Sequence, residues 1–242
     1  MAEPLSLPAV VVVTGTGTGV GKTVATAALA AMILDRSPTT RVAVVKPAQT
    51  GVAPGEPGDL EEVCRLVGSS ERVTYHEFVR LRDPLAPAAA ARRERVTLPP
   101  VASWVGPVTD LAAAHDVVLV EGAGGLLVEL DSRGGTLADL AVALRYKGIS
   151  AGAVVVAGPG LGTLNHTALT AEALARRGIP LLGVIVGTWP QSPHEPDLAM
   201  RENLTDLPKA ARAPIVGRIT DHAGSLSSVD FRRAVATWLT VG

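Results

Sequence analysis

A glycine-rich segment near the N-terminus is the feature that most constrains the fold of this chain. It runs from Gly15 to Thr23 with the sequence GTGTGVGKT, between the β-branched run Val10 to Val13 and a helical segment from Val24 to Asp35. A strand, a glycine loop and a helix in this order are typical of a phosphate-binding loop, in which backbone N–H groups and the helix N-terminus face an anion. In such a loop Lys22 would reach the β- and γ-phosphates, and the Thr23 hydroxyl would bind Mg²⁺. We therefore expect a nucleoside triphosphate to bind here.

The rest of the chain repeats this alternation of strands and helices. Short apolar runs predict parallel strands at Val42–Val45, Val117–Val120, Ala153–Ala157, Leu182–Val186 and Pro214–Val216. Segments with helical spacing follow at Thr163–Arg177 and Ser228–Leu239. The alternation predicts the α/β class, with a doubly wound, mostly parallel sheet and helices on both faces, as in P-loop NTPases. We expect residues 1–242 to form one domain, in which Pro84 to Pro107 is a surface insertion with one or two short helices.

Composition limits the classes of function. Hydrophobic residues make up 47% of the 242 residues and charged residues 19%, which excludes charge-driven disorder. The formal net charge is −1, so there is no basic bias toward nucleic acid or an anionic membrane. The single cysteine, Cys64, excludes an intramolecular disulfide and a cysteine-based zinc site. The N-terminus lacks the features of an export signal and the apolar runs are too short to span a bilayer, so we expect a soluble, cytoplasmic protein.

A second candidate site follows the second predicted strand, where open α/β sheets place their ligands. The sequence there is Lys46-Pro47-Ala48-Gln49-Thr50-Gly51. Lys46 either points into the crevice or is a solvated surface charge, and its position alone leaves both open. Asp59 opens a helical segment, so it is a candidate for the helix N-cap and equally for a metal ligand. Cys64 lies on the apolar stripe of that segment, which favours a small core residue over a reactive thiol.

Two further glycine-rich turns follow predicted strands. In Glu121-Gly122-Ala123-Gly124-Gly125 the acidic side chain is placed to hold Mg²⁺ and the glycines allow the backbone to approach phosphate. The alternative is a plain turn with a solvated glutamate. The segment Gly160 to His166 opens a helix whose free N–H groups suit a carboxylate, although capping by Thr163 or Asn165 explains the same residues. His166 lacks partner ligands at a metal-binding spacing, which argues against zinc.

Taken together, four segments resemble the dethiobiotin synthetase family: Gly15 to Thr23, Lys46-Pro47 with Thr50-Gly51, Glu121 to Gly125, and Gly162 to His166. Their order and spacing fit along nearly the whole chain. The conjunction of Lys46-Pro47 with Glu121 to Gly125 is much more specific than the phosphate loop alone. The resemblance implies a homodimeric ligase of biotin synthesis that depends on Mg²⁺ and ATP. Its reaction closes the ureido ring of dethiobiotin from 7,8-diaminononanoate and CO₂.

The resemblance also implies a role for each matching residue. Lys46 and Lys22 are implied as catalytic cations, and Thr23, Asp59 and Glu121 as Mg²⁺ ligands. Thr50 would contact the substrate, and the substrate carboxylate would be bound across the dimer by Gly162, Thr163, Leu164 and Asn165. The implied nucleotide contacts are Thr18, Gly19, Val20, Gly21, Lys22, Thr23, Val24, Asp59, Glu121, Gly122, Ala123, Gly124, Gly187 and Thr188.

The chain departs from the expected patterns at several positions. Thr16 stands where the strict loop motif has its first glycine, so the loop is a longer variant. Gly17 stands where the family loop often has an aspartate. Gly187-Thr188 stands where many members carry an asparagine that reads adenine, which leads us to hypothesise that CTP or GTP is accepted beside ATP. The last base-side loop, near Ile219 to Asp221, aligns only loosely.

Other functions of phosphate-loop proteins are alternatives. A regulatory or partitioning ATPase usually carries a second lysine in its loop, at the position of Gly17 here. A GTPase would need an Asn-Lys-x-Asp motif, which does not occur. A related amidoligase would need a glutamine-hydrolysing domain with a nucleophilic cysteine, and Cys64 on an apolar helix stripe is a poor candidate.

Overall fold

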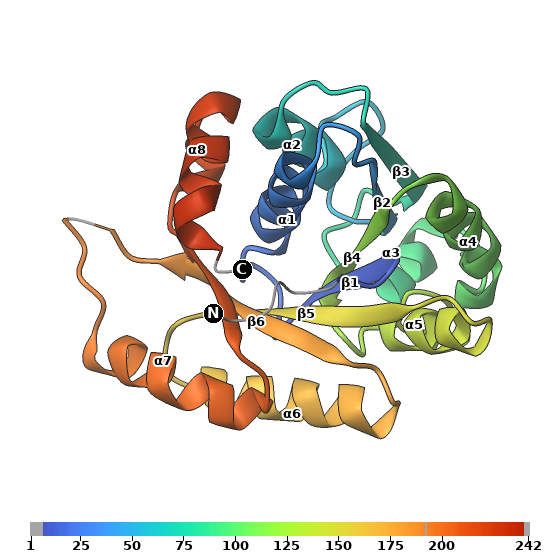
Figure 1. The fold of residues 1–242 in the computed structure, drawn as a ribbon. Coiled ribbons are helices and arrows are strands. Elements are labelled where there is room, and N and C mark those ends of the chain that lie inside the picture. The colour runs from blue at the N-terminus through green and yellow to red at the C-terminus, as the bar shows by residue number, and fades with distance from the viewer. Residues whose placement is uncertain (1–6, 192, 240–242) are drawn as a thin grey trace.

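A computed structural model describes residues 7–191 and 193–239. The prediction that the N-terminus is not an export signal concerns residues 1–10, and the first six of these lie outside the described residues. The described residues form one sheet of seven parallel strands in the order β3-β2-β4-β1-β5-β6-β7 (Figure 1). The strand order changes direction beside β1, and open α/β sheets bind ligands at such a point, outside the carboxyl ends of the strands. The strands are β1 (Val10–Gly15), β2 (Val42–Gln49), β3 (Val73–Arg80), β4 (Val117–Gly125), β5 (Ala151–Ala157), β6 (Leu181–Trp189) and β7 (Ile215–Thr220).

Helices cover both faces of the sheet, which confirms the predicted doubly wound α/β fold. One face packs against α1, α2 and α8, and the other against α4, α5 and α6, with α7 beside α6 (Figure 1). Within the described ranges no helix has the length and apolar character needed to cross a membrane. The helices are α1 (Lys22–Arg36), α2 (Asp59–Val67), α3 (Pro87–Glu94), α4 (Val105–Ala114), α5 (Leu137–Tyr146), α6 (Thr163–Arg176), α7 (Leu198–Ala211) and α8 (Ser228–Trp238).

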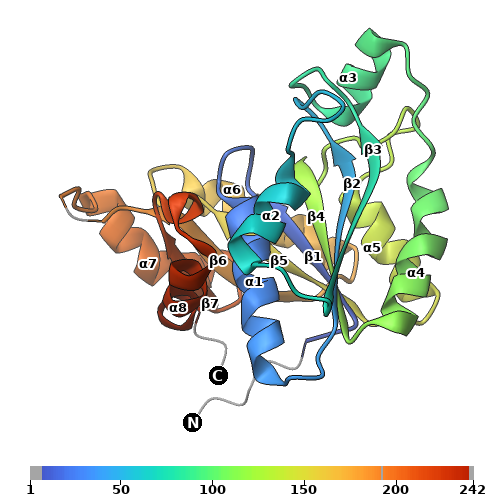
Figure 2. The same ribbon diagram turned by 90° about the horizontal axis from the view of Figure 1, so that it is seen from above.

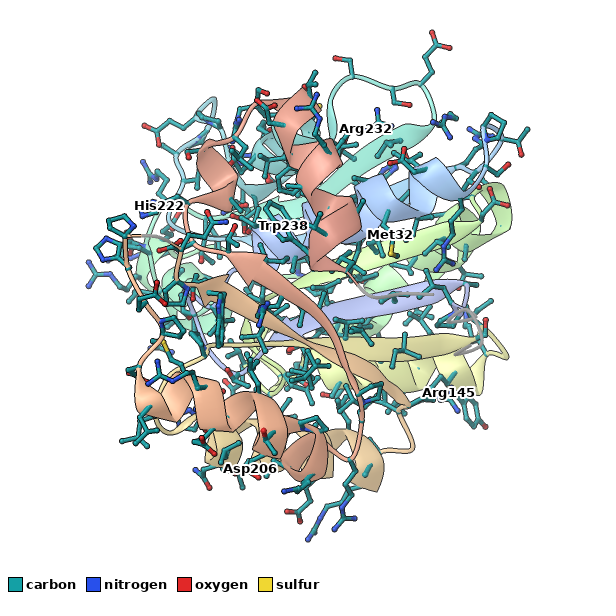
Figure 3. All side chains as sticks on the ribbon, turned by 60° about the vertical axis from the view of Figure 1, so that its left-hand side comes forward. Met32, Arg145, Asp206, His222, Arg232 and Trp238 are labelled. Atoms are coloured by element: carbon teal, nitrogen blue, oxygen red, sulfur yellow. The ribbon has the colours of Figure 1, made fainter. Side chains whose placement is uncertain are left out.

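The central strands are valine-rich without alternation because both of their faces are buried. In β1, Val11 and Val13 belong to the cluster under α1, α2 and α8, whereas Val10 and Val12 belong to the cluster under α4 and α5. The first cluster extends to Trp238 of α8 (Figure 3). The Trp238 ring packs edge-on against Phe231 at a centroid distance of 5.4 Å. These two clusters fix the sheet that carries the candidate site.

The strands that carry Lys46, Glu121 and Gly187 are longer than predicted. β2, β4 and β6 continue past these residues, so each lies within a strand rather than after one. β2 runs through Pro47 because Lys46 and Ala48 on either side of it pair with β3. A prediction that ends a parallel strand at the first glycine or proline after its apolar run therefore makes the strand too short.

Some elements have no counterpart in the sequence prediction. β3 is an edge strand with the polar sequence VTYHEFVR, most of which is only half-buried, so it lacks the apolar run of the inner strands. The helices α4, α5 and α7 were not predicted either. Edge strands and surface helices are held mainly by tertiary packing, which local periodicity does not reveal.

The region Pro84 to Pro107 contains α3 and a short 3₁₀ helix, Val101–Trp104, as predicted, but it is not wholly a surface insertion. Trp104 is buried and its ring lies 6.1 Å from that of Phe78 on β3. The buried carboxylate of Asp131 accepts the backbone N–H of Val101 over 2.6 Å, which ties the region to the loop after β4. The prolines indicated a loop correctly, but the apolar residues between them belong to the core.

Candidate active site

A cavity of about 740 Å³ opens at the carboxyl ends of β1, β2 and β4. Figure 2 shows α3 beyond the ends of β2 and β3, on the same edge of the sheet. Three of the four segments singled out in the sequence line this cavity, namely the phosphate loop, the end of β2 and the end of β4. The switch point of the strand order and the conspicuous residues of the sequence therefore coincide.

The phosphate loop joins β1 to α1 and leaves the helix N-terminus open. Gly19 and Gly21 have φ values of 76° and 92°, in the left-handed region that favours glycine. No side chain caps α1, so its first N–H groups are available to an anion. Lys22 is the first residue of the helix, two residues earlier than predicted, and its Nζ donates to the Gly17 carbonyl over 2.9 Å. The lysine thus folds back over the loop.

Lys46 forms the centre of a buried charge cluster, which excludes the alternative of a solvated surface charge. The residue is 3% exposed. Its Nζ lies 2.5 Å from Asp59 Oδ2 and 2.9 Å from Glu121 Oε1, and donates to the Gly122 carbonyl over 3.1 Å. All three N–H groups of the ammonium therefore have an acceptor. Glu121 is fully buried, so the alternative of a solvated glutamate in a plain turn is excluded as well.

The cluster controls the charge of its members. Burial would lower the pKa of Lys46, but the charges of Glu121 and Asp59 raise it above the usual value. Burial would raise the pKa of Asp59, and the Lys46 charge holds it below the usual value. Burial lowers the pKa of Lys22, and the Lys46 charge lowers it further. Lys46 is therefore an ammonium and Asp59 a carboxylate at neutral pH.

Glu121 keeps one carboxylate oxygen free. Its Oε1 accepts from Lys46 and, over 3.0 Å, from the Thr23 hydroxyl, whereas the buried Oε2 has no hydrogen-bond partner among the described residues. Such an atom is costly unless a ligand satisfies it. A hydroxyl and two carboxylates are the hard oxygen donors that Mg²⁺ prefers. Thr23, Asp59 and Glu121 therefore fit a Mg²⁺ ion whose other ligands come from phosphate and water. The described residues hold no group of three or more acidic, histidine or cysteine side chains that could bind a metal ion by themselves.

Asp59 is not the N-cap of its helix, so the capping alternative for it is wrong. The cap position belongs to Gly58, whose N–H donates to Glu61 over 2.7 Å, and Asp59 is the first residue of α2. Because Asp59 lies one residue after the cap position, its carboxylate pairs with Lys46 instead of capping the helix. Cys64 is half-buried rather than fully buried, beside the buried Val63 and Val67 on the predicted stripe.

Sequence reasoning missed one wall of the cavity. Thr50 lines the cavity together with Ala48 and Gln49, two residues of the second candidate segment to which the sequence assigned no role. An apolar wall comes from Pro84 to Pro87, just before and at the start of α3, and from Val128 after β4. No local signal marks these residues, because only the tertiary fold brings the two segments to the cavity.

Gly187 and Thr188 lie against the phosphate loop but do not line the cavity. A Cβ atom at Gly187 would lie 2.1 Å from the Val20 carbonyl oxygen, so no side chain fits there. Thr188 has a φ of 53°, which is unusual for a residue with a branched side chain. The backbone N–H of Asp221 donates to the Trp189 carbonyl over 2.7 Å, which places the Ile219 to Asp221 loop beside the end of β6.

The loop after β7 contains an exposed histidine, His222. His222 has a φ of 56°, and its ring projects outward from the molecule (Figure 3). Val20 and Gly122, both implied as nucleotide contacts, also do not line the cavity. Their roles and those of Gly187 and Thr188 stay predictions.

The segment Gly162 to Asn165 is not brought to this cavity. It opens α6, where Gly162 is the N-cap with a φ of 93° and no side chain caps the helix, so capping by Thr163 or Asn165 is wrong. The buried Thr163 hydroxyl has no hydrogen-bond partner among the described residues. In the described chain, this segment is separate from the residues around Lys46.

Comparisons of the sequence point to one family. The AAA domain family matches residues 9–224. The chain is 51% identical over 230 residues to a protein of Streptomyces coelicolor named ATP-dependent dethiobiotin synthetase BioD, covering 95% of this chain and 91% of that protein. It is 52% identical over 229 residues to a protein of Rhodococcus jostii with the same name, covering 95% and 94%.

Comparisons of the structure concern the fold alone. A ParA family ATPase from Chlorobium tepidum superposes with a TM-score of 0.53 at 15% identity, covering 94% of this chain and 92% of that one. A chain of the MinC:MinD cell division protein complex from Aquifex aeolicus gives a TM-score of 0.52 at 17% identity, covering 93% of this chain and 86% of that one. These neighbours support a P-loop NTPase-like α/β fold.

Proposed function

We propose, since the chain belongs to the family of ATP-dependent dethiobiotin synthetases, that this ATP-dependent ligase closes the ureido ring of dethiobiotin from 7,8-diaminononanoate, CO₂ and ATP. The observation that carries the proposal is the buried Lys46 ammonium between Asp59 and Glu121, at the end of a cavity that the phosphate loop also lines. A fixed cation next to a phosphate-binding loop is suited to a reaction in which two anions must meet.

The proposed reaction has three steps. One amine of the substrate attacks CO₂, a C–N bond forms, and the loss of a proton leaves a carbamate. A carbamate oxygen then attacks the γ-phosphorus, and the bond from that phosphorus to the ADP oxygen breaks, which gives a carbamic-phosphoric anhydride. The second amine attacks the carbonyl carbon, the bond from that carbon to the phosphate oxygen breaks, and the ring closes with release of phosphate and a proton.

The chain's own cations would make the second step possible. Carbamate and triphosphate repel each other, and charge shifts onto the leaving group as the phosphoryl group transfers. Lys22 would contact the β- and γ-phosphates, and Lys46 would face the carbamate and the transferring group. The two lysine side chains are already fixed by hydrogen bonds before substrate arrives. Thr23, Asp59 and Glu121 would hold Mg²⁺, which supplies further positive charge to the phosphate oxygens.

The substrate would span two kinds of surface. The apolar wall of Pro84 to Pro87 and Val128 suits an aliphatic chain, and Thr50 offers a hydroxyl beside it. The carboxylate at the far end would be bound by the N–H groups that open α6 at Gly162 to Asn165. Because this segment does not line the same cavity, the proposal requires a homodimer in which each site is completed by a second subunit.

Phosphate release tests the proposed function. Purified protein with ATP, Mg²⁺ and bicarbonate is expected to release phosphate only when 7,8-diaminononanoate is added, with dethiobiotin detected by mass in equal amount. The diamine is required because without a carbamate no nucleophile is held against the γ-phosphate. Release that is indifferent to the diamine would contradict the proposal and favour a signalling ATPase or another phosphate-loop ligase.

Relaxed base choice is a second expected result. The Gly187 position has no room for any side chain, which supports the hypothesis that the base is not read by an asparagine there. CTP and GTP are therefore expected to compete with ATP. A hydrogen bond to the base contributes about 1–2 kcal/mol of discrimination between nucleotides, so without it the three kcat/KM values should lie within about tenfold of one another. Mixed-nucleotide turnover, read as ADP, CDP and GDP formed, measures this. Exclusive use of ATP would refute the hypothesis.

A further inference from the structure

Gln49, the last residue of β2, has no role in the proposed chemistry although it is 4% exposed and lines the cavity. Its backbone is fixed in the sheet, where its carbonyl accepts the N–H of Leu81 over 2.9 Å. The side chain therefore extends from a rigid strand end, three residues after Lys46, into the space between the end of β2 and the start of α2.

The Gln49 amide connects two site residues. Its Oε1 accepts the backbone N–H of Asp59 over 2.9 Å, and its Nε2 donates to the Thr50 carbonyl over 3.1 Å. The orientation of the amide is determined by these partners, because a flipped amide would place its NH₂ against an N–H and its oxygen against a carbonyl. One planar group thus sets the spacing between Thr50 and Asp59.

Arg80 of β3 supports the same loop from the other side. It pairs with Gln49 in the β2–β3 ladder, and its guanidinium donates to the carbonyl of Glu56 over 2.5 Å and forms ion pairs with Glu77 and Glu61. Gly58 is enclosed between the two side chains, since a Cβ atom there would lie 2.9 Å from Gln49 Oε1 and 3.2 Å from the Arg80 guanidinium. The segment from Thr50 to Asp59 is therefore held at both ends.

We propose that Gln49 is a positioning residue that holds Thr50 and Asp59 at the separation the reaction needs. It does not touch reacting atoms. It acts through Thr50 on the diamine and through Asp59 on Lys46 and Mg²⁺, so one amide couples occupancy of the two halves of the cavity. This inference rests on the proposed function for the roles of Thr50 and Asp59, but the hydrogen bonds that carry it do not depend on those roles.

The first test is Gln49→Met, which keeps the length of the side chain and removes both hydrogen bonds. The KM for the diamine and the Mg²⁺ concentration for half-maximal rate are each expected to rise about tenfold or more, because small misplacements near a site have effects of up to about a hundredfold. Binding of ADP without Mg²⁺, measured by calorimetry, is expected to stay unchanged because the phosphate loop is untouched. The matched control is Gln191→Met at an exposed glutamine, which should change none of these quantities.

A second variant acts on the same amide without removing a polar group. Gly58 has a φ of −109°, which alanine adopts readily, so Gly58→Ala tests the contacts of the new Cβ, of which the shortest is with Gln49 and the next residue reached is Arg80. It is expected to raise the same two quantities as Gln49→Met. Gly106→Ala is its control, because no atom lies within 4 Å of a Cβ at that glycine. Should Gln49→Met fail to fold, Gly58→Ala decides the matter.

The two proposals fail in different ways. Wild type and both controls report whether dethiobiotin is made at all, which tests the function. A rise in the diamine KM and in the Mg²⁺ requirement in both variants, with ADP binding unchanged, supports the positioning role. A loss of kcat with both quantities within about twofold of wild type would overturn it, because that pattern indicates only a smaller fraction of folded enzyme. If wild type makes no product, Mg²⁺-dependent ADP binding still reports on Asp59, and an unchanged Mg²⁺ requirement in both variants would overturn the inference.

Discussion

Lys46→Ala is expected to lower kcat by about a hundredfold to a thousandfold, the usual loss for one preorganised contact to developing charge. The ammonium is buried between Asp59 and Glu121, and Lys22, the other lysine that lines the cavity, is held by the Gly17 carbonyl. Steady-state phosphate release with saturating diamine and ATP measures the effect. Turnover near that of wild type would show that the role assigned to Lys46 is wrong.

Loss of catalysis must be separated from loss of stability in this variant. Removing one partner of a buried pair costs about 3–5 kcal/mol when the other charge stays uncompensated. We expect Lys46→Ala to fold nonetheless, because the two hydrophobic clusters that fix the sheet do not include Lys46. The double variant Lys46→Ala with Glu121→Gln removes the uncompensated charge, so its Tm should exceed that of the single variant while its activity stays low. Recovery of activity in the double variant would mean that Lys46 serves only to neutralise Glu121.

The fold of the central sheet could be predicted from the sequence because its strands are simple. The valine runs at β1 and β4 are buried on both faces, and continuous apolar runs next to glycine loops have few other interpretations. β3 escaped because an edge strand shows half-buried, mixed residues. A local sequence pattern reveals an element when burial constrains consecutive residues. It does not reveal an element whose structure is determined by packing against residues that are distant in the sequence.

The candidate site was predictable to the same degree. Lys46 and Glu121 are 75 residues apart in the sequence, and their pairing follows from β2 and β4 being neighbours in the sheet. The motifs identified both residues, but only the fold shows that the lysine is buried between two carboxylates. Gln49 and the wall from Pro84 to Pro87 carry no signal of their own, because an amide or a proline acquires a role only through its neighbours in space.

The second large effect is expected for Gly187→Ala. A Cβ atom there would lie 2.1 Å from the Val20 carbonyl oxygen and 3.4 Å from Val156 Cγ1, so the phosphate loop must move away from β6. Overpacking of this kind costs about 1–3 kcal/mol of stability. The loop cannot move without redirecting the N–H groups around Gly21, which has a φ of 92° and lies against Gly187. Nucleotide affinity is therefore expected to fall about a hundredfold.

The matched control for this prediction lies in the same loop. Gly17→Ala adds the same methyl group where no atom lies within 4 Å of a Cβ and where φ is not in the left-handed region. Its nucleotide affinity should stay within about twofold of wild type, since such substitutions change free energies by about 0.5 kcal/mol or less. Calorimetric titration with ADP, together with Tm, measures both variants. If Gly187→Ala bound ADP as tightly as Gly17→Ala, the contact between β6 and the phosphate loop would not control the nucleotide site. The absence of a side chain at Gly187 would then have to be explained by the base alone, which the nucleotide competition measures independently.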